Sequence, residues 1–152
     1  MRKTIISDAS CFIVLSNIGE MELLHNLYPE IITTPEIADE FGEKLPEWVI
    51  VSNVKDIACQ QVLELQIDKG ESSAIALALE TPNSILILDD YKARKVAQSL
   101  NLFYIGTIGV IIKAKLLGVI PSVKPILNKM KTTNFRLSAE LEREALSAAK
   151  EY

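Results

Sequence analysis

The sequence predicts an α/β fold in which helices cover both faces of a central, mostly parallel sheet, giving a three-layer α/β/α sandwich. The first observation is that short runs of aliphatic and β-branched residues alternate along the chain with segments of helical spacing. The second is that these helical segments are long enough to cross over between parallel strands. Strands alternating with such helices form βαβ units, which place the strands side by side in one direction.

Five segments are predicted as strands. The first and fourth are aliphatic runs, and the second and fifth are short apolar runs of the same kind. The third starts at Trp48 and alternates in a β-like pattern. In chain order the predicted strands are 3–8, 31–33, 48–54, 84–88 and 102–105.

Helical spacing and capping residues define the segments between and after these strands. Thr34, Pro35 and Glu36 are the N-cap, first-position proline and first-turn acid of one helix. Gly19 and Gly70 are expected to separate neighbouring elements. The predicted helices are 10–18, 20–28, 35 to about 41, 57–67, 71–80, 91–100, 107–117, about 121–131 and 138–150.

Composition indicates one globular domain over residues 1–152. The chain has 49% hydrophobic and 24% charged residues, which argues against disorder, and its length suffices for a proper core. We expect the core of the domain at about 3–120 and a C-terminal helical extension at about 121–152.

The pattern of apolar segments and cysteines predicts a cytoplasmic protein. Asp8 cuts short the apolar run after the basic N-terminus, so no secretory signal fits. Lys113 and Lys115 interrupt the most apolar region, which argues against a membrane span. Cys11 and Cys59 match no metal-binding or redox spacing, and we expect both as reduced thiols.

Charge is distributed unevenly along the chain. Residues 1–90 carry sixteen acids and five bases, whereas residues 91–139 carry nine bases and no acid. An acidic cluster beside a basic half suits a protein that holds a metal and binds a polyanion. The alternative is that the helices carry their lysines on solvated faces.

Two apolar runs end on carboxylates. The first runs into Asp8, with Ser10 two residues later, and the fourth predicted strand runs into Asp89 and Asp90. Residues after the carboxyl ends of parallel strands gather at one edge of the sheet, where α/β proteins place their sites. Like charges held close there are costly unless a cation or a proton relieves them, so we expect a divalent-metal site. Helix capping is the alternative role for Asp8 and for one member of the pair.

Two further acids are candidates on helices. Glu40 lies a full turn inside a short helix, between apolar residues, so that its side chain can point at the site. Glu71 follows Gly70 at the start of an Ala-rich helix, where the helix dipole favours an ionised carboxylate. Solvation of Glu40 and a plain first-turn role for Glu71 are the alternatives.

Carboxylates of this kind are hard oxygen ligands for Mg²⁺ or Mn²⁺ and can support phosphodiester hydrolysis. His25 is the single histidine, which makes zinc improbable. The sequence has no glycine-rich phosphate loop, serine elbow or Cys-His arrangement, so P-loop binding and covalent acyl chemistry have no support. A phosphotransferase is disfavoured because Asp8-x-Ser10 lacks the second aspartate of haloacid-dehalogenase-type phosphatases.

The order of these motifs resembles the PIN-domain nucleases. Asp8-x-Ser10 resembles the first acid of that family and the polar residue after it, and Glu40, Glu71 and Asp90 resemble its second, third and fourth acids. Asp89 stands as a neighbour of the fourth acid. The Gly106-Thr107 turn resembles the one where family members place a site hydroxyl, so Thr107, like Ser10, is expected to support the ligands.

The resemblance implies a PIN-like fold and a Mg²⁺- or Mn²⁺-dependent ribonuclease, often the VapC-like toxin of a toxin–antitoxin pair and commonly a homodimer. It implies that Asp8, Glu71 and Asp90, with Asp89 accessory, hold the metal and that Glu40 helps to orient the attacking water. RNA is the expected substrate and an antitoxin a possible partner. The rival hypothesis is a PIN-like module that binds RNA or protein without cleaving.

Bases that flank the acidic strand end or the Gly106-Thr107 turn are the candidates for phosphate contacts. They are Lys92, Arg94, Lys95, Lys113 and Lys115.

Overall fold

The computed structural model describes residues 3–151, in which one parallel sheet has the strand order β3-β2-β1-β4-β5. The strands are β1 (Thr4–Ser7), β2 (Ile31–Thr33), β3 (Val49–Val51), β4 (Ser84–Ile87) and β5 (Phe103–Ile105). Every neighbouring pair in the sheet is parallel. The predicted α/β fold with a central parallel sheet is confirmed. Met1, Arg2 and Tyr152, which the single-domain prediction includes, lie outside the described residues.

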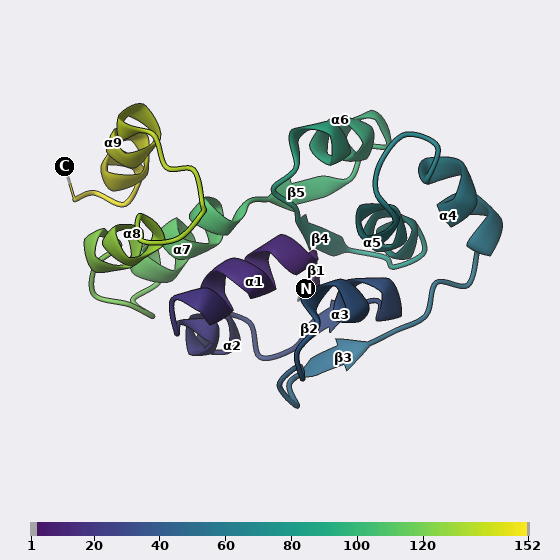
Figure 1. The fold of residues 1–152 in the computed structure, drawn as a ribbon, viewed down its shortest axis with the longest axis horizontal. Helices are drawn as coiled ribbons and strands as arrows, with labels where there is room; N and C mark the ends of the chain where they lie inside the picture. The colour runs from purple at the N-terminus through teal and green to yellow at the C-terminus, as the bar shows by residue number, and fades with distance from the viewer. Residues whose placement is uncertain (1–2, 152) are drawn as a thin grey trace.

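Helices lie on both sides of the sheet (Figure 1). α1, α2 and α7 lie on one side and α5 on the other, while α3 packs against both α1 and α5, and α8 and α9 extend beyond α7. The helices are α1 (Ala9–Asn17), α2 (Met21–Leu27), α3 (Pro35–Phe41), α4 (Ile57–Leu63), α5 (Lys69–Leu79), α6 (Tyr91–Ser99), α7 (Thr107–Leu116), α8 (Lys124–Met130) and α9 (Ala139–Ala148). Within residues 3–151 no helix has the length and apolar character needed to cross a membrane.

The strand order has a switch point between β1 and β4, and the crevice of the sheet is the region outside the carboxyl ends of these two strands. The chain winds from β1 to β2 and β3 in one direction, and then adds β4 and β5 on the other side of β1. Such a reversal is the point where open parallel sheets bind ligands, at the carboxyl ends of the strands. Ser7 of β1 pairs with Ile87 of β4, so the residues that follow these two positions emerge together.

The core is aliphatic on both faces of the sheet. Ile6 of β1 and Leu86 of β4 are fully buried, and so are Phe12 of α1 and Ile111 of α7 on the flanking helices. Each such side chain contributes about 1.5–3 kcal/mol by leaving water. Helix α5 is buried from Ser72 to Ala78, because its alanines let it approach the sheet closely. This packing fixes the strand ends that carry the acids.

Several predicted boundaries are wrong by a few residues. Helix α5 begins at Lys69, so Gly70 lies in its first turn rather than before it. Helix α4 ends at Leu63, because the chain turns there to bury Ile67. Helix α8 begins at Lys124 and not near 121, because Pro125 occupies its first turn, where no N–H is needed.

Most bases of the acid-free stretch meet acids from other parts of the chain. Lys129 pairs with Glu20 at 2.6 Å, and Lys124 and Lys131 both pair with Glu142. The charge asymmetry along the sequence is therefore partly neutralised in the folded protein.

Lys115 is also neutralised, at the C-terminus. Its ammonium lies 3.5 Å from Glu151 and donates to the carbonyl oxygen of Ala149 at 2.8 Å. Glu151 accepts hydrogen bonds from Ser122 and from the N–H of Val123, so it ties the chain end to the start of α8.

Candidate functional site

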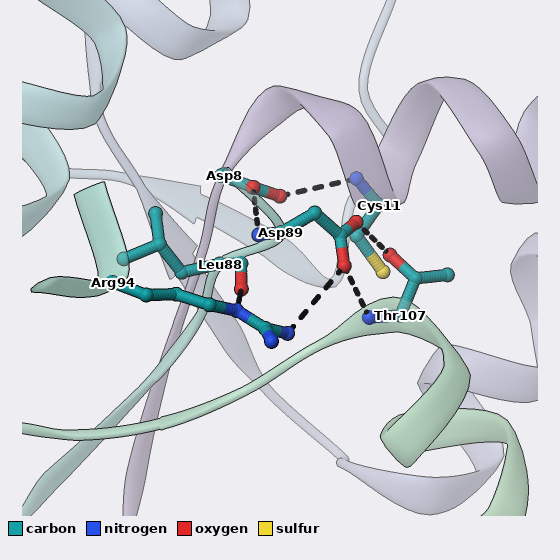
Figure 2. Close-up of polar contacts among 6 residues, drawn as sticks. All are labelled: Asp8, Cys11, Leu88, Asp89, Arg94 and Thr107. Carbon is teal, nitrogen blue, oxygen red and sulfur yellow. Dashed lines mark hydrogen bonds and ion pairs between the residues drawn. The ribbon is translucent and has the colours of Figure 1, made fainter. Parts of the chain in front are cut away.

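Asp8 lies at the carboxyl end of β1 and is 3% exposed. Its Oδ1 accepts a hydrogen bond from the N–H of Cys11 at 3.1 Å and caps α1. Its Oδ2 accepts from the N–H of Asp89 at 3.1 Å, which links the ends of β1 and β4 (Figure 2). Asp8 therefore has the capping role and also sits at the crevice.

Asp89 is held by groups from α6 and α7. Its carboxylate accepts hydrogen bonds from the N–H of Thr107 at 2.8 Å and from the Thr107 hydroxyl at 2.5 Å. The Arg94 guanidinium lies 3.9 Å from the same carboxylate and is anchored by its Nε, which donates to the carbonyl oxygen of Leu88 at 2.7 Å. Figure 2 shows these groups converging on Asp89. Asp89 therefore bridges Asp8 and the start of α7, whereas the sequence offered only helix capping as a structural role for one of Asp89 and Asp90.

Asp90 caps α6, with Oδ2 accepting from the N–H of Ala93 at 2.9 Å. It lines a hollow of about 280 Å³ together with Glu71, Asp68 and Lys92. The starts of α5 and α6 thus bring Asp68, Glu71 and Asp90 to the edge of the sheet where Asp8 and Asp89 lie.

Two carboxyls of this region have strongly raised pKa values. Burial, with the charge of Asp89 as the next cause, raises the pKa of Asp8 to about 7. Burial, with the charges of Asp90 and Asp68, raises the pKa of Glu71 to about 7. The charge of Glu71 also helps to raise the pKa of Asp8, so the two carboxylates repel one another. Such mutual repulsion is what a bound cation relieves.

The donor set fits a hydrated divalent ion better than a closed cage. Within residues 3–151, no three His, Cys, Asp or Glu side chains are already arranged as a metal site. Mg²⁺ keeps several waters and needs only one or two protein carboxylates beside its substrate phosphates. Asp8, Glu71 and Asp90 offer oxygen ligands of this kind. Each oxygen of Asp8 accepts one N–H and keeps a further lone pair, whereas Asp89 accepts two hydrogen bonds from Thr107 and is already paired with the Arg94 guanidinium.

A protein-family model matches the sequence over almost its whole length. The DUF3368 model, described as a PIN domain, matches residues 4–151. The chain belongs to the PIN domain family. The match runs through the C-terminal helices α8 and α9 as well as the sheet. No curated protein matches the sequence.

Two predicted site residues of this PIN domain lie differently from expectation. Ser10 was expected to support Asp8, but Asp8 itself is the N-cap and, among the described residues, Ser10 makes no hydrogen bond to it. The helix starts one residue earlier than predicted, which moves Ser10 into its first turn. Glu40 is exposed and lies against Gly70, whose absent side chain leaves room for it. Burial and the charge of Asp68 raise the pKa of Glu40.

The structure separates the five candidate cations into two groups. Lys92 and Arg94 lie with the carboxylates, as described above, and Lys95 is one turn further along α6. Lys113 lies over the Tyr28 ring and lines a different cavity, of about 720 Å³. It is about 9 Å along α7 from Thr107. Lys115 is paired with Glu151, near the C-terminal end of the chain.

Asp68 lies among the candidate site residues, although the sequence did not single it out. It occupies the N-cap position of α5 without a side-chain capping bond, and it lines the hollows on both sides of that helix start. The signal for it was an aspartate just before a helix whose first turn contains glycine and glutamate.

Gly106 is needed for the contact between Arg94 and Asp89. A Cβ at Gly106 would overlap the Arg94 guanidinium and lie 2.9 Å from Asp89 Oδ1. We expect Gly106→Ala to displace Arg94 and to lower the free energy of unfolding by about 1–2 kcal/mol in denaturant titrations. If the clash with Arg94 is the main cause, Gly106→Ala should lower the stability less in the Arg94→Ala background than in the wild type. An unchanged stability of Gly106→Ala would contradict this role.

Proposed function

We propose that this PIN domain is a Mg²⁺- or Mn²⁺-dependent endoribonuclease that hydrolyses RNA phosphodiester bonds between β1, β4 and α5. The observation that carries the proposal is that carboxylates from three elements meet at the crevice of the sheet. Asp8 after β1 accepts the N–H of Asp89 after β4, and the next residue, Asp90, lines one hollow with Glu71 of α5. Burial and neighbouring acids raise the pKa of Asp8 and of Glu71 to about 7. Membership of the PIN family, whose members are typically nucleases, supports the same reaction class.

In this proposal Asp8, Glu71 and Asp90 hold the metal. When bound, the metal supplies a polarised water and offsets the charge on the phosphate. Asp8 is held in place by two N–H donors, so its oxygens need no reorientation on binding. Lys92 lines the same hollow as Glu71 and Asp90 and is placed to contact the phosphate.

Asp89 acts by positioning in this account. Its N–H holds Asp8, and its carboxylate fixes the Gly106-Thr107 turn through Thr107. Arg94 completes the arrangement by neutralising Asp89 beside Asp8. Glu40 lies on the Asp68 side of Glu71 and belongs to the outer rim, where it can receive a proton or orient a water near Glu71.

The biological setting proposed here is the toxin half of a toxin–antitoxin pair, acting as a homodimer with a protein antitoxin as partner. It rests on the resemblance to VapC-like proteins within the PIN family.

The experiment is incubation of a mixed RNA pool with purified protein in Mg²⁺, in Mn²⁺ and in EDTA. Fragmentation in either metal and intact RNA in EDTA is the expected result. Intact RNA in every sample, from protein shown to be folded and free of inhibitor, would contradict the nuclease proposal and favour the non-cleaving RNA-binding module.

A further inference from the structure

An exposed aromatic ring stands directly beside the carboxylate site. Tyr91 follows Asp90 in the chain, begins α6 and is 73% exposed, so most of its ring faces solvent. The Lys95 ammonium lies 5.4 Å from the ring centroid, one helical turn further along. Because Tyr91 is 73% exposed with Lys95 over its ring, most of the side chain stays open to a ligand.

The cations that remain available also gather there. Of the nine bases in residues 91–139, five lie within ion-pair distance of an acid: Arg94, Lys115, Lys124, Lys129 and Lys131. Within residues 3–151, no acid lies at that distance from Lys92 or Lys95, which follow Tyr91 by one and four residues on α6. Lys113 and Arg136 share this property but lie on α7 and in the segment before α9, away from Tyr91.

We propose that Tyr91, Lys92 and Lys95 form a surface that binds single-stranded RNA beside the carboxylates. A base stacks on the open part of the Tyr91 ring, while Lys92 and Lys95 contact neighbouring backbone phosphates. This inference rests on the proposed ribonuclease function and specifies how that site takes its substrate.

The chemistry favours a single strand over a duplex. Aromatic stacking requires an unpaired base, and an A-form duplex keeps its bases stacked on one another. Unpaired cations next to an exposed aromatic ring are the combination by which proteins hold single strands without reading their sequence. Because Lys92 shares a hollow with Glu71 and Asp90, a strand bound here has its phosphates beside the acids.

A second exposed aromatic provides a matched control. Phe103 of β5 is 66% exposed and has Lys3 at 4.6 Å from its ring centroid. Its neighbour Tyr104 lies under Arg94 of α6, and successive side chains of a strand point to opposite faces. Phe103 therefore offers the same kind of cation–aromatic pair on the face of the sheet away from α6.

The test measures binding in EDTA, where no cleavage occurs, by fluorescence anisotropy of a labelled single-stranded RNA. Tyr91→Ala should weaken binding by about 5- to 150-fold, the value of one stacked base. Tyr91→Phe should bind like the wild type, because the ring and not the hydroxyl carries the contact. Phe103→Ala should also bind like the wild type, and the effect of Tyr91→Ala should vanish on an RNA duplex.

Three results would overturn the inference: wild-type affinity in Tyr91→Ala, an equal loss in Tyr91→Phe, or an equal loss on duplex RNA. A dimer that dissociates in Tyr91→Ala with unchanged RNA affinity would overturn it too and assign the ring to a protein interface. Cleavage in Mg²⁺, measured on the same preparations, keeps the two proposals apart. Wild-type cleavage with no effect of Tyr91 contradicts only this inference, and Tyr91-dependent binding without cleavage contradicts only the nuclease.

Discussion

Asp90→Asn is expected to lower the rate of RNA cleavage in saturating Mg²⁺ by about 100-fold or more. The variant removes a charged ligand from the site but leaves the helix intact, because asparagine caps α6 as well as aspartate does. The loss should therefore appear in the rate of cleavage while the melting temperature stays close to that of the wild type. The measurement is single-turnover cleavage of a labelled RNA at several Mg²⁺ concentrations.

Asp39→Asn is the matched control for this prediction. Asp39 is exposed, lies one residue from Glu40 and loses the same charge on substitution. It should cleave at the wild-type rate. A rate in Asp90→Asn that is equal to that of Asp39→Asn would remove Asp90 from the proposed site. Asp8→Asn is a less clean test, because both Asp8 oxygens accept N–H donors and an amide nitrogen cannot replace either.

Glu71→Gln is expected to stabilise the metal-free protein at pH 8. The pKa of Glu71 is raised from 4.5 to about 7 by burial and by neighbouring acids, so the folded state binds more protons than the unfolded state between these values. Wild-type stability thus falls as the pH rises from about 4.5 to 7 and stays reduced above that. The full shift is worth about 3 kcal/mol, but Glu71 is only half-buried, and solvent screening reduces the expected gain to about 1–2 kcal/mol.

The measurement is the melting temperature in EDTA at pH 5 and pH 8. A domain of this size should gain about 3–6 °C at pH 8 from Glu71→Gln, and much less at pH 5. Adding Mg²⁺ should raise the melting temperature of the wild type more than that of the variant. The bound cation offsets the repulsion between Glu71 and its neighbouring acids, which Glu71→Gln has already removed. A variant that melts below the wild type at pH 8 would contradict the proposed repulsion.

The positions of the strand-end acids follow from sequence because they depend on one rule of the fold. Once a parallel sheet is predicted, the residues after β1 and β4 must emerge at the same edge, and Asp8, Asp89 and Asp90 do so. The N-cap pattern of Thr34 and Pro35 likewise fixes the start of α3, because capping is decided by residues close in the chain.

What escaped prediction depends on contacts between distant segments. Asp89 meets Thr107 only because β5 lies beside β4 and delivers the start of α7 to the crevice. Lys115 was expected to contact RNA, but it meets Glu151 at the far end of the chain, a pairing that no local pattern encodes. Glu40 and Asp68 lie near one another because α3 packs on α5, which helical spacing within one segment does not reveal.

Binding of Mn²⁺ in the absence of RNA tests most directly whether these carboxylates form a metal site. Free Mn²⁺ measured by electron paramagnetic resonance gives the affinity of the wild type, of Asp90→Asn and of Glu71→Gln, with Asp39→Asn as control. We expect the wild type and Asp39→Asn to bind Mn²⁺ alike, in competition with Mg²⁺, and the other two variants to bind at least about 10-fold more weakly. Equal affinity in all four proteins, or no binding by the wild type, would contradict the proposed site.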